Sequence, residues 1–371
     1  MNKKQDTHEA VADQEKRLAD GRSRRDFLKL GGIGLAGLAG SAALGAEPSQ
    51  LNARESGSGQ RRTADRNTAV EDIPVVLECS INETAQKPYE PKTVQEHITE
   101  MTKVLDAGAA IAHNHSKQFD EDPEKAAQFY AEVYRAVLKK HPHAIVYPTI
   151  NLDLRVLHGE RCALAPGASC AHQRVLAEAG LTNMVMLDTG VSAVSLLEGD
   201  GIANDEAFYV YQFWPEDVRF SCQICTDFGC GTAVAVYEPG WMKNVVAMAR
   251  AGTLPRGSKL NLFFGFDGVG SMPPPIPEAL ELYLKMMEGL DLKWSVGCPL
   301  SDRSIMDTPL ARMALERGGN LRVGLEDYTT GPSNVEQIER AKELVAAVGR
   351  RIINGPEAIE YLDIPFPATR P

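Results

Sequence analysis

The sequence has no excess of basic residues, and no second long apolar run follows the one near its N-terminus. Lysine and arginine number 39 against 50 aspartate and glutamate residues, so the 371-residue chain carries a formal net charge of -11. Binding to nucleic acid requires a basic face, and this balance argues against such a partner. Histidine is absent after His172, so the second half of the chain must supply any metal ligands from acids or thiols.

The first 46 residues have the pattern of an export signal. A charged stretch leads into SRRDFLK at residues 23–29, which is the twin-arginine pattern, and an uncharged run rich in Gly, Ala and Leu follows at 30–46. This run is about 17 residues long, which is marginal for a membrane span. We therefore expect residues 1–46 to be a signal peptide that engages the twin-arginine (Tat) machinery and delivers a periplasmic or otherwise exported protein. An uncut N-terminal anchor is the alternative.

Residues 47–72 are rich in Ser, Gly, Arg and Gln and have almost no large apolar side chains, which predicts a flexible linker. The remaining residues 73–371, about 300 in all, suit one large α/β domain better than two small domains. Short apolar, β-rich runs alternate there with amphipathic helical segments, a pattern typical of a parallel sheet covered by helices.

The predicted strands cover residues 74–80, 109–115, 144–151, 183–188, 233–237, 260–266, 293–297 and 321–326. Among the predicted helices are 93–107, 123–140, 277–288 and 332–348. Eight strands at this spacing predict a single-domain (β/α)8 TIM barrel, in which the active site lies at the C-terminal ends of the strands.

Seven cysteines leave at least one thiol unpaired, and an exported protein favours disulfides. Cys162 and Cys170 lie in one predicted loop and are a candidate disulfide pair. The segment with Cys222, Cys225 and Cys230 is compatible with a metal or cluster site, with a disulfide, or with plain buried thiols. The spacing alone does not choose between these hypotheses.

His113-Asn114-His115 ends the second predicted strand. Side chains two apart on a strand share a face, so both imidazoles are expected at one point of the barrel mouth, where they suit zinc. His141 and His143 have the same spacing but precede the third strand, so we expect them in a solvated loop on the opposite face. Hydrolytic barrels of the amidohydrolase type need further histidines on later strands, which this chain lacks.

The eighth predicted strand ends in LRVGLED at residues 321–327. Strand alternation places Arg322 and Glu326 on the inner face and turns Asp327 away into the loop. A charged pair inside a barrel is costly unless it is used or mutually paired, so a third metal ligand and a structural Arg-Glu pair both remain open.

Several segments occur in the order of one known family. Besides Glu83 after the first strand, they are AGAAIAHNH at 107–115, Asp122-Pro123 with Tyr130, GSM at 270–272 followed by Pro277-Glu278, KWSVG at 293–297, and RVGLED at 322–327 with PSN at 332–334. These segments span residues 75 to about 362 and resemble the β-keto acid cleavage enzyme family, zinc-dependent barrels similar to 3-keto-5-aminohexanoate cleavage enzyme.

The resemblance implies that zinc is held by His113, His115 and Glu326. The catalytic residues that it implies are Glu83, Arg322, Asp327 and Thr149. The implied reaction is a retro-Claisen exchange, in which a small β-keto acid and acetyl-CoA give acetoacetate and a new acyl-CoA. In this scheme zinc is the Lewis acid, Asp327 is the base and Arg322 stabilises negative charge.

The chain departs from the family pattern on the catalytic side. The third strand continues as TINLD at 149–153 where the family has a Thr-Thr-Gly-type turn, and an insertion follows at about 154–173. The loop after Asp327 is short, and the basic residue expected near the histidine pair is shifted to Lys117.

Export conflicts with the use of acetyl-CoA, because acetyl-CoA is a cytoplasmic pool. The sequence therefore leaves three functions open: an exported, diverged zinc lyase or hydrolase for a small oxo acid, a family-type cleavage enzyme whose signal is inactive, and a non-catalytic metal- or solute-binding protein. Glu83, Arg322 and Asp327 argue against the last, since a metal store needs none of them. Barrels of this kind often form homo-oligomers, which we expect here.

Overall fold

The computed structural model describes residues 69–82, 90–116, 123–150, 167–195, 197–202, 209–267 and 271–365. These residues all belong to one compact unit, residues 62–371. The predicted signal peptide, most of the predicted linker, and the candidate residues Glu83, Lys117 and Cys162 lie outside the described residues. The first element of the described residues is a 3-10 helix, η2 (Val70–Asp72).

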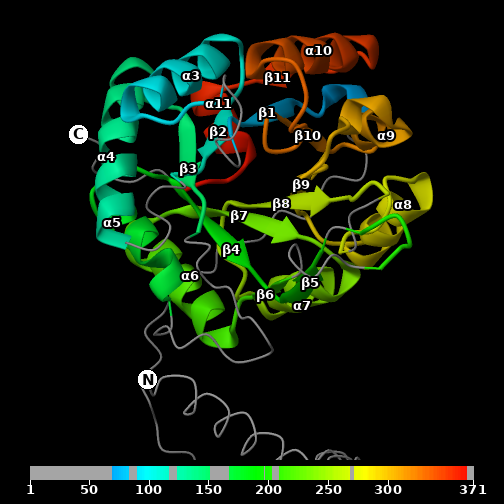
Figure 1. Cartoon of the computed structure of the whole chain (residues 1–371), viewed down its shortest axis with the longest axis horizontal. Coiled ribbons are helices and arrows are strands. Elements are labelled where there is room, and N and C mark those ends of the chain that lie inside the picture. The colour runs from blue at the N-terminus through cyan, green and yellow to red at the C-terminus, as the bar shows by residue number, and fades with distance from the viewer. Residues whose placement is uncertain are drawn as a thin grey trace, which may run out of the picture. The chain divides into compact units, whose positions relative to one another are not determined.

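Eight parallel strands form a nearly closed barrel, as predicted (Figure 1). They are β1 (Val75–Ser80), β2 (Ile111–Asn114), β3 (Ile145–Pro148), β4 (Met184–Asp188), β7 (Gly231–Val236), β8 (Ser258–Phe263), β9 (Lys293–Gly297) and β10 (Asn320–Val323). Their order around the sheet is β3-β2-β1-β10-β9-β8-β7-β4. The two end strands approach one another where the Thr182 hydroxyl, just before β4, donates to the Val146 carbonyl oxygen of β3 at 2.6 Å.

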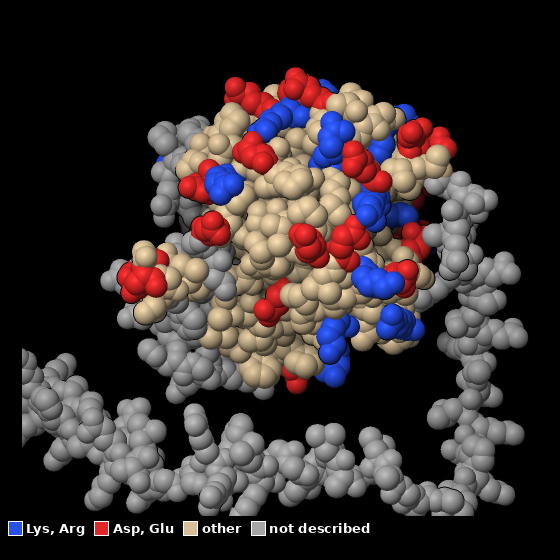
Figure 2. Space-filling view, turned by 90° about the vertical axis from the view of Figure 1, so that its right-hand side faces the viewer, with Lys and Arg blue, Asp and Glu red and all other residues tan. Residues whose placement is uncertain are grey.

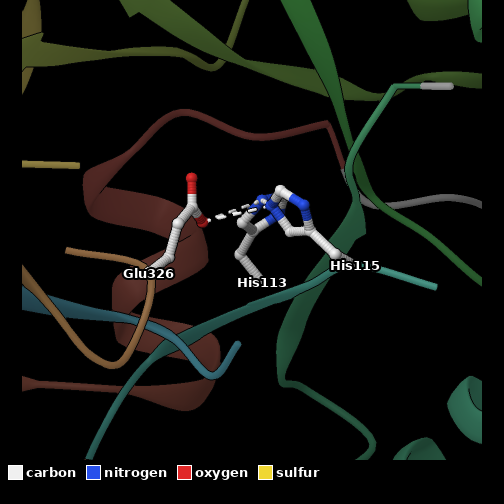
Figure 3. A group of neighbouring side chains, drawn as sticks. All are labelled: His113, His115 and Glu326. Carbon is white, nitrogen blue, oxygen red and sulfur yellow. Dashed lines mark hydrogen bonds and ion pairs between the residues drawn. The ribbon is translucent and has the colours of Figure 1, made fainter. Parts of the chain in front are cut away.

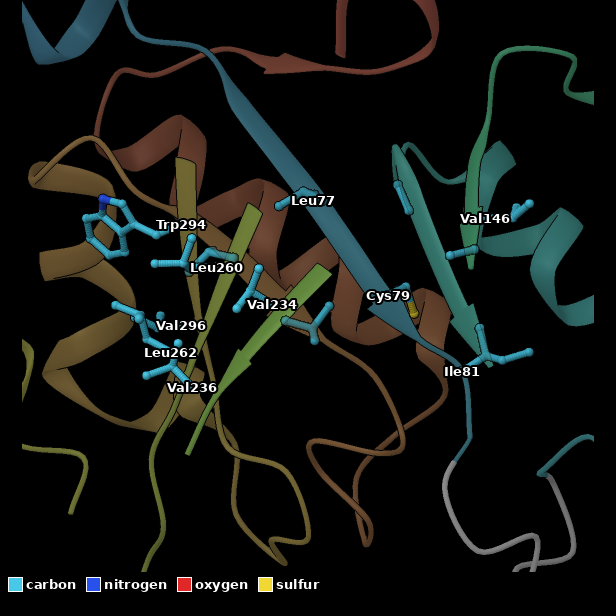
Figure 4. Packing of buried hydrophobic residues seen from close by; sticks show 14 of the residues in the cluster. Leu77, Cys79, Ile81, Val146, Val234, Val236, Leu260, Leu262, Trp294 and Val296 are labelled. Carbon is cyan, nitrogen blue, oxygen red and sulfur yellow. The ribbon is translucent and has the colours of Figure 1, made fainter. Parts of the chain in front are cut away.

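The outer faces of the strands pack against the helices and form the main apolar core. Figure 4 shows this layer, with Leu77 and Cys79 on β1, Leu260 and Leu262 on β8, and Val296 on β9, all fully buried. Burial on both faces explains why these strands are almost continuous apolar runs.

Among the described residues, eight helices cover the barrel. They are α3 (Val94–Asp106), α4 (Pro123–Lys140), α5 (Ala171–Glu178), α6 (Pro215–Phe228), α7 (Pro239–Ala251), α8 (Pro277–Met286), α9 (Pro309–Glu316) and α10 (Asn334–Ala347). Of these, α3, α4, α8 and α10 match the four predicted segments closely. Capping boxes at Thr93 and Ser333 begin α3 and α10, and proline occupies the first turn of several others.

The N-terminal end of the barrel is closed by the C-terminal segment. Strand β11 (Ile352–Ile353) pairs with the start of β1, and α11 (Gly355–Tyr361) follows it. Their apolar residues pack in one cluster with the inward-facing Val76, Ile111 and Ile145. His143 is exposed and its Cβ lies near Gly355 at this closed end, as predicted. His141 is only half-buried, with Nε2 3.2 Å from Asp106 Oδ1. A functional site is therefore restricted to the C-terminal ends of the strands.

An antiparallel hairpin follows β4 and was not predicted. It consists of β5 (Val191–Val194) and β6 (Tyr209–Gln212), with Val191 paired to Gln212. Its strands are only four residues each and are widely separated in sequence, so they offer little periodicity to recognise.

The surface that lies on the right in Figure 1, around α8, α9 and α10, carries charges of both signs. Figure 2 shows acidic and basic side chains interspersed around an uncharged area on this face, so the net charge of -11 is not gathered there as an acidic patch. Within the described ranges, none of the helices combines the length and the apolar character needed to cross a membrane.

Candidate metal centre and active site

Three predicted ligands converge at the C-terminal end of the barrel. His113 lies on β2, His115 follows it, and Glu326 comes after β10; β1 lies between these strands and pairs with both. Figure 3 shows the three side chains turned toward one another. The two Nε2 atoms are 3.0 Å apart, and Glu326 Oε2 lies 3.4 Å from that of His113 and 3.2 Å from that of His115.

This geometry fits a metal ion. Ligands about 2.0–2.1 Å from one tetrahedral zinc are about 3.3 Å apart, close to the separations of these three atoms. Nδ1 of His113 lies 3.1 Å from the Tyr147 carbonyl oxygen. Because a carbonyl only accepts, the proton resides on Nδ1 and leaves Nε2 available as a ligand. Among the described residues, this is the one group of three His, Cys, Asp or Glu side chains close enough to hold an ion.

The protonation states agree with ligand roles. Burial, assisted by His115 and Arg322, lowers the pKa of His113 to about 3 despite the nearby Glu326 carboxylate, so the ring is neutral near neutral pH. Burial disfavours ionisation of Glu326, but Arg322 and the two histidines outweigh it and hold the pKa of this carboxyl well below its usual range. Two histidines and one carboxylate are a common donor set for catalytic zinc.

Glu326 is positioned by a sharp break after β10. Gly324 has φ +127°, and a Cβ at this position would lie 2.2 Å from the Ser80 carbonyl oxygen, so only glycine allows the chain to pass so close to β1. The Ser80 hydroxyl donates to Glu326 Oε2, and Arg322 Nη2 donates to the same oxygen at 2.6 Å.

Asp327 does not turn away into the loop, so that prediction was wrong. The regular strand ends at Val323, and strand alternation no longer applies beyond Gly324. The Asp327 side chain is buried, with Oδ2 2.7 Å from Arg322 Nη1. Burial raises the pKa of Asp327 to about 7, with Glu326 and Glu78 adding to the rise and Arg322 opposing it.

The loops after β9 and β10 hold these acids from outside. Gly297, the last residue of β9, leaves room for Asp327, because a Cβ there would lie 2.5 Å from Asp327 Oδ1. Leu300 has φ +62°, an unfavourable conformation for leucine, and its amide donates to the Glu326 carbonyl oxygen at 3.1 Å. The Thr329 amide donates to the Ser301 carbonyl oxygen at 2.7 Å.

A buried charge network beneath the metal centre was missed in the sequence. Glu78 on β1 and Lys259 on β8 are completely buried, with Nζ of Lys259 2.6 Å from Oε2 of Glu78. Glu78 Oε1 accepts from Arg322 Nε at 3.0 Å and from the Tyr147 hydroxyl. Burial would raise the pKa of Glu78, but Lys259 and Arg322 outweigh it and lower the pKa to about 2. Lys259 also donates to Asn261 Oδ1 at 2.5 Å.

The sequence did contain a feature that could have indicated this network: a charged residue at an inward-facing position of a predicted strand. Val76, Glu78 and Ser80 alternate toward the barrel interior, as Lys259 and Asn261 do on β8. The two strands are 181 residues apart in sequence, so their pairing required the sheet order.

Thr149, the remaining predicted site residue that the structure describes, is not part of the cluster of His113, His115 and Glu326. Thr149 is buried just after β3, where its amide donates to the Asn114 carbonyl oxygen at 3.1 Å and its carbonyl accepts from His172 Nε2 at 2.7 Å. It therefore lies beside the strand that carries the histidine pair. Asn82, also missed, fixes His115 by accepting from its amide and donating to its carbonyl, at 3.1 and 3.0 Å.

None of the described cysteines belongs to the cluster of His113, His115 and Glu326. Cys170 is a free, buried thiol that accepts from the Ser221 hydroxyl at 3.5 Å, and its candidate partner Cys162 lies outside the described residues. Cys225 and Cys230 are buried, with their sulfur atoms each 3.7 Å from a carbonyl oxygen, those of Gly231 and Thr182. These contacts favour the buried-thiol hypothesis for this segment.

The fold is an α/β barrel, and three side chains that could hold a metal ion lie at the C-terminal end of its strands. The sequence profile of the beta-keto acid cleavage enzyme family matches residues 74–364, and the chain belongs to this family.

Three relatives show the breadth of the family. The chain is 26% identical to a 3-dehydrocarnitine:acetyl-CoA trimethylamine transferase of Rhizobium meliloti, over 76% of this chain and 90% of that one. It is 24% identical to the 3-keto-5-aminohexanoate cleavage enzyme of Acetoanaerobium sticklandii, over 75% of this chain and 92% of that one. It is also 24% identical to a 3-oxoadipate:acetyl-CoA acetyltransferase of Cupriavidus necator, over 79% of this chain and 94% of that one.

A solved structure shares the architecture. The apo structure of ObcA superposes with a TM-score of 0.53 at 16% identity, over 75% of this chain and 66% of that one. At this identity the likeness supports the fold alone.

The Glu78–Lys259 pair predicts a measurable coupling in stability. Lys259→Met leaves a buried carboxylate without its closest cation, so we expect the free energy of unfolding to fall by about 3–5 kcal/mol. The double variant Glu78→Gln/Lys259→Met removes both charges and should cost less than the sum of the single changes. Urea unfolding followed by circular dichroism measures all three.

Lys285→Met is the matched control, because Lys285 forms an exposed pair with Glu288 at 2.7 Å. We expect almost no change in stability for this variant. A loss in Lys259→Met no larger than in the control would contradict the importance of the buried pair.

Proposed function

We propose that the protein is a zinc-dependent enzyme that cleaves a carbon–carbon bond of a small β-keto acid by retro-Claisen chemistry, with acetyl-CoA as the second substrate wherever the protein meets the cytoplasmic pool. The observation that carries this proposal is the buried cluster of His113, His115 and Glu326 with Arg322 and Asp327 directly beside it. A metal-binding protein without catalysis has no need for a buried arginine whose guanidinium contacts three acids.

The residues of the chain divide the proposed chemistry between them. Zinc held by the two histidines and Glu326 would polarise the keto and carboxylate oxygens of the substrate as a Lewis acid. Arg322 would stabilise the negative charge that develops on the substrate oxygen. Asp327 would accept a proton from the carbon between the keto and carboxylate groups. Glu83 would orient the substrate or transfer a proton, a role carried over from the family resemblance.

The named relatives support acetyl-CoA as the second substrate. Two of them carry acetyl-CoA in their names, and all three names contain a keto acid or its derivative. In the proposed reaction the deprotonated carbon between the keto and carboxylate groups attacks the acetyl carbonyl of acetyl-CoA, and CoA leaves as the thiolate. The thiolate then attacks the original keto carbon, the bond between this carbon and the acetylated carbon breaks, acetoacetate leaves, and the remaining acyl group stays attached to CoA.

The proposal predicts the metal content of the protein. We expect about one zinc ion per chain in the purified protein, measured by elemental analysis, and its loss in His113→Ala/His115→Ala. Cys222→Ser/Cys225→Ser is the control and should retain the zinc. Zinc retained without the histidines, or iron lost with the cysteines, would move the metal site to the cysteine segment.

Turnover tests the reaction itself. The zinc-loaded protein should convert acetyl-CoA and at least one β-keto acid from a panel into acetoacetate and a new acyl-CoA, both detected by mass spectrometry. Asp327→Asn keeps the shape of the side chain but removes the proton acceptor, and we expect kcat to fall by about 100-fold or more. Thermal unfolding of the variant establishes that it is folded. Cleavage without acetyl-CoA would identify a lyase or hydrolase instead, and no turnover with any β-keto acid would contradict the proposal.

We further propose that residues 1–46 direct export through the twin-arginine route. Fractionation of cells that express the full chain should place the protein outside the cytoplasm, and Arg24→Lys/Arg25→Lys should retain it inside. Cytoplasmic location of the unaltered chain would contradict export and place the enzyme beside the acetyl-CoA pool.

A further inference from the structure

The two halves of the candidate metal centre come from strands that do not pair with each other. His115 and Glu326 are 211 residues apart in sequence, and β1 lies between β2 and β10 in the sheet. The ladders that join these strands end before the two ligands, because β1 pairs with β2 only as far as His113 and with β10 only as far as Val323. Sheet pairing therefore does not by itself fix the distance between His115 and Glu326.

The histidine side of the centre is attached to the end of β1 by Asn82. The Ile81 amide donates to the His113 carbonyl oxygen at 3.0 Å. The Asn82 side chain then continues the pairing, because its Oδ1 accepts from the His115 amide at 3.1 Å and its Nδ2 donates to the His115 carbonyl oxygen at 3.0 Å. Asn82 is fully buried, so these two bonds satisfy polar groups that water cannot reach. One side chain thus holds both backbone groups of a metal ligand.

The carboxylate side is attached to the same segment by Asn334, the first residue of α10. Its Oδ1 accepts from the amide of Leu325, the residue before Glu326, at 3.0 Å. Its Nδ2 donates to the Ile81 carbonyl oxygen and to Glu100 Oε1, both at 3.0 Å. Asn334 is fully buried, and its amide group uses its acceptor and both donors in these contacts.

We infer that Asn82 and Asn334 are positioning residues that set the spacing between His115 and Glu326, and hence the affinity of the centre for its metal. Both act through the end of β1, where the Ile81 amide bonds to the histidine strand and the Ile81 carbonyl bonds to Asn334. The inference rests on the proposed function, because it concerns the zinc site of that proposal. It extends the proposal to two residues that are not ligands themselves.

The physical basis is preorganisation of the ligands. A ligand that is already held at its bonding position loses little freedom when the metal arrives, whereas a ligand on a released backbone must be ordered by the metal itself. Glu326 depends most on such support, because the regular strand ends at Val323 and the chain turns at Gly324. Loss of a group that orients a metal ligand typically weakens metal binding by about 10- to 100-fold.

Zinc affinity tests the inference without any substrate. Competition with a chromophoric chelator measures Kd for the full chain and for Asn82→Ala and Asn334→Ala. We expect each change to raise Kd by about 10- to 100-fold. Because both residues act through the same end of β1, the double variant should raise Kd by less than the product of the two single factors. The absorption spectrum of the Co²⁺-loaded protein should also change, because it reports the geometry of the ligands.

Asn320→Ala is the matched control. Asn320 is also a fully buried amide that joins neighbouring strands, since its Oδ1 accepts from the Val76 amide at 2.8 Å and its Nδ2 donates to the Trp294 carbonyl oxygen at 2.9 Å. It begins β10, at the closed end of the barrel. We therefore expect this variant to lose thermal stability in the zinc-free state but to keep the zinc affinity of the wild type. Asn82→Ser and Asn334→Ser, whose hydroxyl is too short to reach both partners, replace any alanine variant that does not fold.

The outcomes separate the inference from the proposed function. Wild-type Kd in Asn82→Ala and Asn334→Ala, or an equal loss of affinity in Asn320→Ala, overturns the positioning role and leaves the zinc centre intact. Single factors that multiply in the double variant contradict the shared route through the end of β1. A wild-type protein that binds neither zinc nor Co²⁺ overturns the zinc centre itself, and the proposed function with it.

Discussion

Arg322 joins the barrel interior to the metal centre through three carboxylates. Nε contacts Glu78 at 3.0 Å, Nη2 contacts Glu326 at 2.6 Å and Nη1 contacts Asp327 at 2.7 Å. A planar guanidinium directs these donors along fixed directions, so the three acids are held in one arrangement around it. Arg322 and Ser80 both donate to Glu326 Oε2 and so hold this carboxylate beside the histidines. Glu78, which is paired with Lys259, in turn accepts from Arg322 Nε.

The order of strands around the barrel makes this arrangement possible. β1 lies between β2 and β10, so Glu78, Ser80, His113 and Arg322 meet although they come from the two ends of the domain. Closure of the opposite end by β11 and α11 leaves the C-terminal end as the accessible side of the interior, which agrees with the location of active sites in this fold.

The eight barrel strands and four of the helices were predictable from the sequence. The side chains whose positions follow from strand alternation alone were predictable too. His113 lies on β2 and His115 follows it directly, so strand alternation places both on one face. The four helices whose bounds were predicted begin with proline or with a capping box. Asp327 was misplaced because one glycine, Gly324, ends the alternation just before it. Glu78 and Lys259 were missed because each is a single charge in an apolar run, and only the sheet order shows that they are partners. The hairpin of β5 and β6 was missed because its strands are too short for a periodic signal.

Charge balance connects the barrel interior with the proposed substrate. Glu78, Glu326 and Asp327, when ionised, exceed Lys259 and Arg322 by one negative charge, and all five side chains are buried. A zinc ion bound as proposed would reverse this excess to one positive charge, which the single carboxylate of a β-keto acid would neutralise. In a buried site, where an uncompensated charge is costly, this balance favours a substrate with one carboxylate at the metal.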